Sequence, residues 1–310
     1  MNQNILGWLL DGPDWLKYAV ELHLLDKNPD PGLALKDPAI VSLRERLSNR
    51  QLGLPALLEK KIYYTHAGNA YWYLYFLADI GLTARDLGIQ AELEQLLARQ
   101  SPSGDFITEP GTMPNYYCIS AILLSTIAWL GFKEYPAVRK YLKVVLDTQR
   151  YDGGWHCEKS RSGGESYDPE SCPMDNLNIL MLVGQYDDLR NSDRFNGAID
   201  LLLYHWKQRD RKLRLDGFGV GSRYSALKYP AVDYGILRVL DAVSVFPHAI
   251  KRPVFSEMLD WVRKKAIDGK YTPEAASGSF PGFDFDQMEQ PSRWLTFLIS
   301  RIEKRMGLTA

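Results

Sequence analysis

The stretch CISAILLSTIAWLGFKEYPAVRKYLKVVLDTQR, residues 118–150, contains the two kinds of helix from which the whole chain is built. Its first part, Cys118–Leu130, carries no charge, and a helix without a polar face has to be surrounded by protein. In its second part, Tyr135–Arg150, the apolar residues form one stripe, which is typical of a surface helix packed on a core. The stretch therefore predicts a hairpin made of a buried helix followed by a surface helix.

Helices of these two kinds alternate along the rest of the chain, and strand signals are nearly absent. Leu177–Val183 (LNILMLV) is uncharged, whereas Ser192–Gln208 carries a single apolar stripe. The predicted pairs of a buried and a surface helix are 13–25 with 38–49, 69–82 with 84–99, 114–130 with 135–149, 173–186 with 192–208, and 230–246 with 253–266, and a last buried helix is predicted at 291–305.

Prolines mark a repeat in this pattern. Pro114, Pro173, Pro230 and Pro291 are 59, 57 and 61 residues apart, and each stands where a buried helix is predicted to begin. Proline suits the first helical turn because its missing N–H would have no partner there. A repeat of about 50–60 residues built from helical hairpins indicates a solenoid or a closed ring. Because an open solenoid would leave its apolar inner row in water, we predict an all-α (α/α)6 toroid, with residues 1–310 as one domain.

Composition limits the partners. The 310 residues carry 37 Lys and Arg against 38 Asp and Glu, a net charge of −1, and no nucleotide-binding motif is present, so no nucleic-acid partner is expected. Three cysteines make no disulfide framework, and no cationic leader opens the chain, which favours a cytoplasmic location. The longest nearly uncharged stretch, residues 113–132, is interpreted as a buried helix, so no integral membrane span is expected.

A second repeat follows the predicted surface helices. A long polar residue precedes a glycine and then an aromatic residue in Gln100–Phe106 (QSPSGDF), Gln149–Trp155 (QRYDGGW) and Lys265–Tyr271 (KAIDGKY). Glycine permits the positive-φ turn that ends a helix, so we expect such a turn in each copy. The aromatic side chain is expected to stack over the long polar side chain and to seal the hairpin against its neighbour.

The middle copy has the Q-x3-G-x-W pattern of the squalene cyclases, and the chain resembles the prenyltransferase and squalene-cyclase superfamily from about His66 to its C-terminus. It looks most like single-toroid bacterial proteins described as squalene-cyclase-like or prenyltransferase-like. The resemblance implies an α/α toroid and an apolar, isoprenoid substrate. The acidic D-x-D-D cluster of the cyclases is missing, and the nearest run, Asp284–Gln287 (DFDQ), lies in a Gly/Pro-rich segment. No D-x-C with a later His follows Cys172, so the reaction does not follow from the resemblance.

In a closed arrangement the predicted inner helices run parallel, so that their N-termini, which favour anions, meet at one mouth. An aromatic lining just inside that mouth suits an apolar or isoprenoid ligand. The predicted substrate-binding residues are Tyr116, Tyr117, Asn176, Tyr229, Trp294, His66 and Arg223. The alternative for these side chains is to cap a helix or pack between neighbours. For His66 the alternative is a capping or loop residue, and for Arg223 it is a solvated surface charge.

Asp233 is the preferred catalytic residue, with Tyr234 beside it. It is expected one turn inside a predicted buried helix, and an aspartate in an aromatic cavity has a raised pKa and can donate a proton. The alternative is a first-turn carboxylate that stabilises the helix dipole.

A second catalytic hypothesis rests on Cys172, with Asp175 close behind it in sequence. A thiolate at a helix N-terminus is stabilised, so Cys172 is a candidate nucleophile. With Cys157 and Asp168 it is also a candidate ligand of zinc, the one cofactor considered, although the C-x14-C spacing differs from that of a zinc knuckle. The alternative is that both cysteines are structural.

Three functions remain open at this point. The first is an enzyme that cyclises or isomerises an isoprenoid by proton transfer from Asp233, or that uses the cysteines or a metal. The second is a non-catalytic protein that binds a lipid or a peptide. The third is a glycan-active enzyme with Asp175 and Asp233 as its two carboxylates. The oligomeric state is not predicted.

Overall fold

The computed structural model of the chain describes residues 3–59, 62, 64–102, 104, 117–156, 171–209, 223–232 and 234–308. These residues form helices and connecting turns, with no strand among them beyond two isolated bridges, Ile267 with Lys270 and Tyr271 with Ser292. The all-α prediction is confirmed. None of the described helices is both long and apolar enough to cross a membrane.

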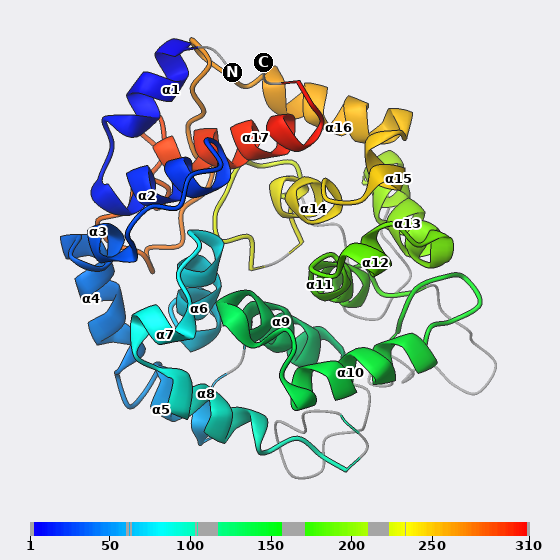
Figure 1. Ribbon diagram of the computed structural model, residues 1–310. Helices are drawn as coiled ribbons and strands as arrows, with labels where there is room; N and C mark the ends of the chain where they lie inside the picture. The colour runs from blue at the N-terminus through cyan, green and yellow to red at the C-terminus, as the bar shows by residue number, and fades with distance from the viewer. Residues whose placement is uncertain are drawn as a thin grey trace.

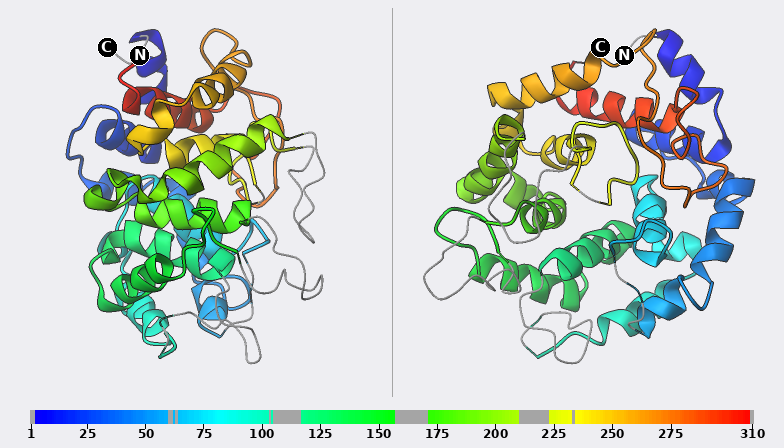
Figure 2. Two further views of the ribbon diagram at one scale, coloured as in Figure 1. Left: turned by 90° about the vertical axis from the view of Figure 1, so that its right-hand side faces the viewer. Right: turned by 180° about the vertical axis from the view of Figure 1, so that it is seen from behind.

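The helices lie in two layers, one inside the other, as Figure 1 and both views of Figure 2 show. The inner layer consists of α2 (Asp14–His23), α6 (Ala70–Asp79), α9 (Tyr117–Ile127), α11 (Pro173–Val183), α14 (Ile236–Val243) and α17 (Arg293–Arg305). The outer layer consists of α1 (Gln3–Leu10), α3 (Pro31–Leu35), α4 (Pro38–Leu47), α5 (Leu54–Leu58), α7 (Ala84–Leu87), α8 (Gln90–Leu97), α10 (Pro136–Asp147), α12 (Asp187–Arg190), α13 (Asn196–Lys207), α15 (Pro247–Ile250) and α16 (Pro253–Arg263). A π-helical turn, Ala128–Phe132, extends α9, and a 3-10 turn, Asp193–Phe195, leads into α13.

Burial separates the two kinds of helix in the way that the sequence pattern predicts. Every residue of α6 and of α11 is buried. In α10 only the stripe Val138, Tyr141, Leu142 and Val145 is buried, so its other side faces solvent. A helix of the first kind is stable only when other helices surround it, which is why these segments lie in the inner layer.

Inner helices pack on one another in chain order. The helix α6 contacts α9, α9 contacts α11, α11 contacts α14, α14 contacts α17, and α17 contacts α2. Between α2 and α6 the ring centroids of Trp15 and Phe76 are 5.3 Å apart. The helix α1 packs on both α2 and α17, so the beginning of the described chain lies beside its end (Figure 1).

The glycine repeat builds the turns between hairpins. Gly104, Gly153 and Gly269 have φ values of 99°, 86° and 75°, which confirms the predicted positive-φ turns. The Nε2 of Gln149 donates to the carbonyl of Gly153 at 2.7 Å and to the carbonyl of Arg194 at 3.0 Å. The glutamine therefore joins the end of α10 to the turn before α13.

Gln100 makes similar contacts. Gln100 Nε2 donates to the carbonyls of Gly104 and Ala137, at 2.6 and 2.8 Å, and so joins α8 to α10. Trp155 is fully buried, donates from its indole to the Val145 carbonyl at 2.8 Å and stacks on Phe195. The two glutamine copies thus fasten one surface helix to the next through amide hydrogen bonds, whereas Lys265 in the third copy pairs with the carboxylate of Glu274.

Two proline predictions are wrong. Pro173 is the first residue of α11, as predicted, but Pro230 lies six positions before the start of α14 and Pro291 lies before the N-cap of α17. In a helix that began at Pro230, the Ile236 amide would bond to the Val232 carbonyl, but it donates to the Tyr224 carbonyl at 2.8 Å. Pro114 lies outside the described residues.

Candidate functional site

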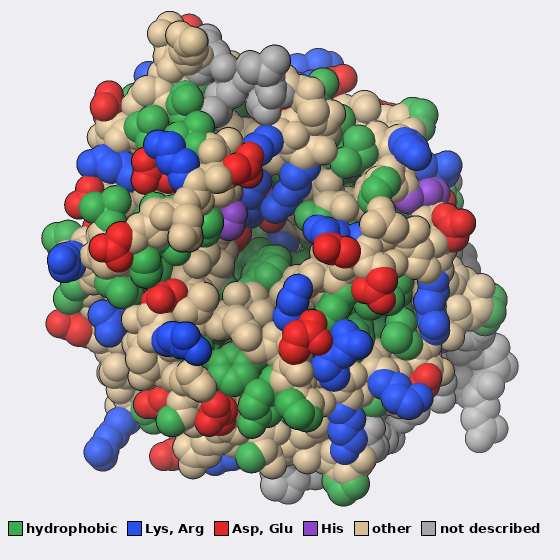
Figure 3. Space-filling model, viewed as in Figure 1, with side chains coloured by type: hydrophobic (Ala, Val, Ile, Leu, Met, Phe, Trp, Pro, Cys, Tyr) green, Lys and Arg blue, Asp and Glu red, His purple; other side chains and the backbone are tan. Residues whose placement is uncertain are grey.

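A pocket of about 620 Å³ opens where the C-terminal ends of the inner helices meet. Figure 3 shows it as a hollow in the centre of this face, with apolar side chains at the floor and Lys and Arg side chains along the edge. The side chains that line it are those of Leu22, His23, Ala78, Asp79, Ala128, Trp129, Lys133, Leu180, Met181, Gln185, Arg190, Asp241, Ala242, Val245, Arg301 and Arg305. The sequence analysis placed the ligand at the opposite, N-terminal ends of these helices.

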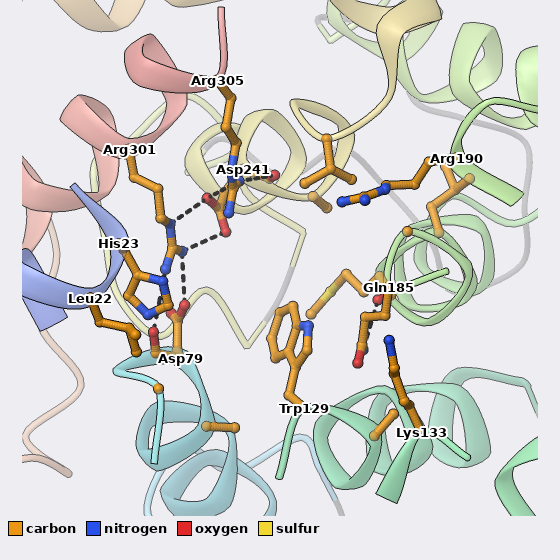
Figure 4. A pocket seen from close by; sticks show the side chains of 18 of the residues that line it. Leu22, His23, Asp79, Trp129, Lys133, Gln185, Arg190, Asp241, Arg301 and Arg305 are labelled. Carbon is orange, nitrogen blue, oxygen red and sulfur yellow. Dashed lines mark hydrogen bonds and ion pairs between the residues drawn. The ribbon is translucent and has the colours of Figure 1, made fainter. Parts of the chain in front are cut away.

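The lining divides into an apolar part and a charged part (Figure 4). Trp129, Leu180 and Met181, from α9 with its π-helical extension and from α11, belong to the apolar part. The charged part contains four lysines and arginines but only two carboxylates. Cations are favoured here because the C-terminal ends of helices carry a negative partial charge.

Arg301 is the centre of the charged part. It is 4% exposed, and its Nη2 lies 2.8 Å from Oδ1 of Asp79 and 2.8 Å from Oδ2 of Asp241. Arg305, one turn later on α17, reaches Asp241 Oδ1 at 2.9 Å and the hydroxyl of Ser244 at 2.8 Å. The last turns of α6, α14 and α17 are therefore held together by ion pairs at the edge of the pocket.

The two carboxyls of this network differ in basicity. Burial alone would raise the pKa of Asp241, but the charges of Arg301 and Arg305 outweigh burial and lower it below its usual value. Burial raises the pKa of Asp79, and Arg301 offsets this only in part. The second partner of Asp79 is a neutral group, the hydroxyl of Tyr229, which donates to Oδ2 at 2.9 Å. Asp79 is therefore the carboxyl at the pocket that holds a proton most readily.

His23, at the end of α2, completes this side of the pocket (Figure 4). Burial, together with the positive charges of Arg301 and Arg305, lowers its pKa to about 3. The imidazole is therefore neutral at pH 7. Its Nε2 has no hydrogen-bond partner among the described residues.

The chain matches no family model, and no curated protein is significantly similar to it. The superfamily resemblance therefore remains a prediction that rests on the repeat.

Several predicted site residues surround the start of α11, at the other end of the inner layer. Cys172 is the N-cap of α11, and its amide donates to the Trp155 carbonyl at 2.8 Å. Asn176 is fully buried; its Oδ1 accepts from the Trp155 amide at 3.1 Å and its Nδ2 donates to the Cys172 carbonyl at 2.9 Å. Asn176 thus fixes this turn, and Asp175 beside it is fully buried as well.

The predicted aromatic residues are packed into the core. Tyr229 and Trp294 are buried with their ring centroids 5.5 Å apart, in a cluster that Phe76 also joins. Tyr234 is buried and stacks on Tyr224, with ring centroids 5.1 Å apart. Of these residues, the structure brings only Tyr229 into contact with a group that lines the pocket.

The remaining predicted residues lie apart or cannot be placed. Tyr117 is buried at the start of α9, and His66 and Arg223 are exposed in connecting segments. The helix α14 begins only at Ile236, so the expected helical turn around Tyr234 is wrong. Outside the described residues lie Tyr116, Cys157, Asp168 and Asp233, and the N-terminal site that needs them stays a prediction.

Metal binding also stays a prediction. No group of three His, Cys, Asp or Glu side chains suited to a metal ion occurs among the described residues, which do not include Cys157 or Asp168. The DFDQ run has structural contacts instead. Asp284 accepts from the Ser292 hydroxyl at 2.8 Å and from the Arg293 amide at 2.6 Å at the start of α17. Asp286 accepts from backbone amides of its own loop, including that of Phe280 at 2.6 Å.

Sequence reasoning missed Asp79, Asp241 and Arg301. A signal was present, because Asp79 is the only charged residue in AYWYLYFLAD and closes an otherwise apolar buried helix. A charge at the end of such a helix is expected to meet a partner there.

Proposed function

We propose that the chain is an (α/α)6 toroid of the prenyltransferase and squalene-cyclase type and a cytoplasmic enzyme acting on an isoprenoid-like substrate with an anionic end. The two layers of helices, the packing of the inner helices in chain order and the Q-x3-G-x-W turn support the fold part of this proposal. The pocket at the C-terminal ends of the inner helices supports the functional part.

The observation that carries the proposal is the composition of the pocket lining. Arg301 and Arg305 pair with Asp241, and Arg190 pairs with Asp187, so the edge carries the positive charge of Lys133, which forms no ion pair among the described residues. An apolar floor below a positive edge fits a molecule with a hydrocarbon body and an acidic end group. The volume, about 620 Å³, falls in the range of about 300–1,000 Å³ typical of small-molecule sites.

Asp79 replaces Asp233 as the proposed acid. Its protonated carboxyl would transfer a proton to one alkene carbon of the substrate, and the resulting cation would lose a proton from a neighbouring carbon back to the carboxylate. The sum is a double-bond isomerisation, which needs no other reactant. The face of Trp129, which lines the pocket, would stabilise the intermediate by cation–π attraction.

Calorimetric titration tests the binding step. We expect an isoprenyl phosphate of 10–15 carbons to bind more tightly than the matching alcohol. Lys133→Gln and Arg190→Gln should each weaken the phosphate about 5–10-fold and leave the alcohol unchanged. Lys264→Gln, on the exposed side of the outer layer, is the control. Equal affinities in all variants would overturn the proposed binding mode.

Turnover tests the chemical step. Asp79→Asn should retain ligand binding and lose isomerisation. Isomerisation is measured from the positions of the double bonds in the product. A wild-type protein that binds the ligand without converting it would favour the non-catalytic lipid-binding function over the enzyme.

A further inference from the structure

Arg238 reaches from α14 into the space between the inner helices. It is 5% exposed, and its guanidinium carbon lies 5.2 Å from the ring centre of Trp72 and 5.8 Å from that of Tyr75, both on α6. Its Nη2 donates to the amide oxygen of Asn178 on α11 at 2.5 Å. Arg238 therefore bridges three inner helices near their middle.

The partners of Arg238 are neutral. Besides Asn178 they include the side chain of Tyr75, the Ala231 carbonyl at 3.4 Å and two thioether sulfurs, those of Met174 at 3.7 Å and Met181 at 3.5 Å. Thioethers are weak acceptors. Among the described residues Arg238 forms no ion pair with a carboxylate, and its buried Nε has no hydrogen-bond partner. A buried charge in such surroundings is costly unless an opposite charge joins it.

Arg301 gives the contrast. It is about as buried as Arg238 and is paired with two carboxylates, whereas no carboxylate is paired with Arg238 among the described residues. A void of about 10 Å³, roughly the space of one water, lies beside Arg238 and is also lined by Lys228, Tyr75 and both carboxylates.

We propose that the protein binds a small monovalent anion at the Nε and Nη2 edge of Arg238. The anion would replace the Met181 sulfur on Nη2 and pair with the Nε–H, and the flexible Met181 side chain would move aside to make room. Asp79 and Asp241 do not prevent this, because Arg301 and Arg305 neutralise them. Met181 also lines the pocket, so the anion is either a free halide or the carboxylate end of a molecule in the pocket.

Thermal unfolding in mixtures of sodium gluconate and sodium bromide at constant ionic strength tests the proposal. The unfolding midpoint of the wild-type protein should rise saturably as bromide replaces gluconate, by about 2–3 °C at five times the dissociation constant. Arg238→Met should show no such rise, whereas Arg263→Met, which removes an arginine on α16, should behave like the wild type. Sodium formate in place of bromide shows whether a carboxylate occupies the same site.

Bromide anomalous diffraction from crystals of the wild-type protein gives a second readout. A peak within hydrogen-bond distance of the Arg238 Nε is expected, and the same peak should be missing in Arg238→Met. If Arg238→Met does not fold, Arg238→Lys should retain the bromide response at reduced affinity. An unfolding midpoint that is independent of the anion, together with no peak at Arg238, would overturn the proposal. The isoprenyl-phosphate titration reports on Lys133 and Arg190, so the two proposals fail independently.

Discussion

Asp79 and Asp241 share one arginine, yet their pKa values shift in opposite directions. Asp241 has a second cation in Arg305, whereas the second partner of Asp79 is the uncharged Tyr229. A carboxyl whose pKa is lowered by folding contributes stability above its unfolded pKa and loses it as the pH falls through the folded pKa. A carboxyl with a raised pKa contributes stability at low pH that is lost as the pH rises through the folded pKa. The two carboxyls therefore give opposite slopes to stability against pH.

Replacing each carboxyl by an amide tests this difference. Asp241→Asn should lower the free energy of unfolding by about 3–5 kcal/mol at pH 7, because Arg301 and Arg305 lose their common partner. Asp79→Asn should lower the free energy of unfolding by less than Asp241→Asn does. This difference from the wild type should become smaller as the pH rises above about 4, because the wild-type carboxyl, whose pKa is raised by folding, loses its stabilising effect over that range. Urea unfolding at three pH values measures both costs. Two equal costs that do not depend on pH would contradict the assignment.

His23 provides a pH effect of its own. Its pKa is lowered to about 3, mainly by burial, while histidine in an unfolded chain titrates near about 6.5. The unfolded state therefore binds the proton first as the pH falls, and stability is lost from about pH 6.5 downward, by at most about 1.4 kcal/mol per pH unit. His23→Gln should lose less stability than the wild type between about pH 7 and pH 5 in urea unfolding. His66→Gln, at an exposed site, is the control.

At the scale of elements, the turns after the outer helices hold the hairpins in order. Gln149 donates two hydrogen bonds and accepts a third from Arg194 Nε at 2.8 Å. Gln149→Ala should therefore lower the free energy of unfolding by about 1–2 kcal/mol, measured by urea unfolding. Gln90→Ala is the matched control, because Gln90 is exposed and its side chain donates to Glu94 alone, also on α8. A cost no larger than that of the control would show that the glutamine does not fasten the hairpins.

The helices themselves were predictable because their signal is local. The run of residues 69–82, in which Asp79 is the only charge, predicts a buried helix, and α6 spans 70–79. The starts of α14 and α17 were not predictable from the prolines. The Ile236 amide bonds to the Tyr224 carbonyl, so α14 begins after Pro230, and Ser292, held by Asp284, is the N-cap of α17, so that helix begins after Pro291. The positions of the prolines do not reveal these contacts.

For the whole molecule, Arg301 links α17 to both α6 and α14. Arg301→Met leaves two buried carboxylates short of a cation and should lower the free energy of unfolding by about 3–5 kcal/mol. Arg263→Met, which breaks more exposed ion pairs with Asp260 on α16 and Glu303 on α17, should cost about 1 kcal/mol or less. Chemical unfolding of both variants measures the difference. Comparable costs would show that the buried network does not hold the inner helices together.

The position of the pocket could not be predicted from the sequence. The hydrophobic pattern shows which helices are buried, but it does not show whether a pocket lies at their N-terminal or their C-terminal ends. Asp79 and Arg301 are separated by 222 positions, and only the completed packing of α17 near α6 brings them together. The end of the inner helices at which the charged part of the pocket forms depends on ion pairs between residues far apart in the sequence, such as Asp79 and Arg301.

The complete burial of α6 and α11 also restricts how this architecture can vary in size. These helices have no exposed face, so the loss of a neighbouring helix would expose apolar side chains to water. Duplication or deletion events that preserve folding must then add or remove an inner helix together with its outer companion. Smaller insertions are confined to the connecting turns at the surface.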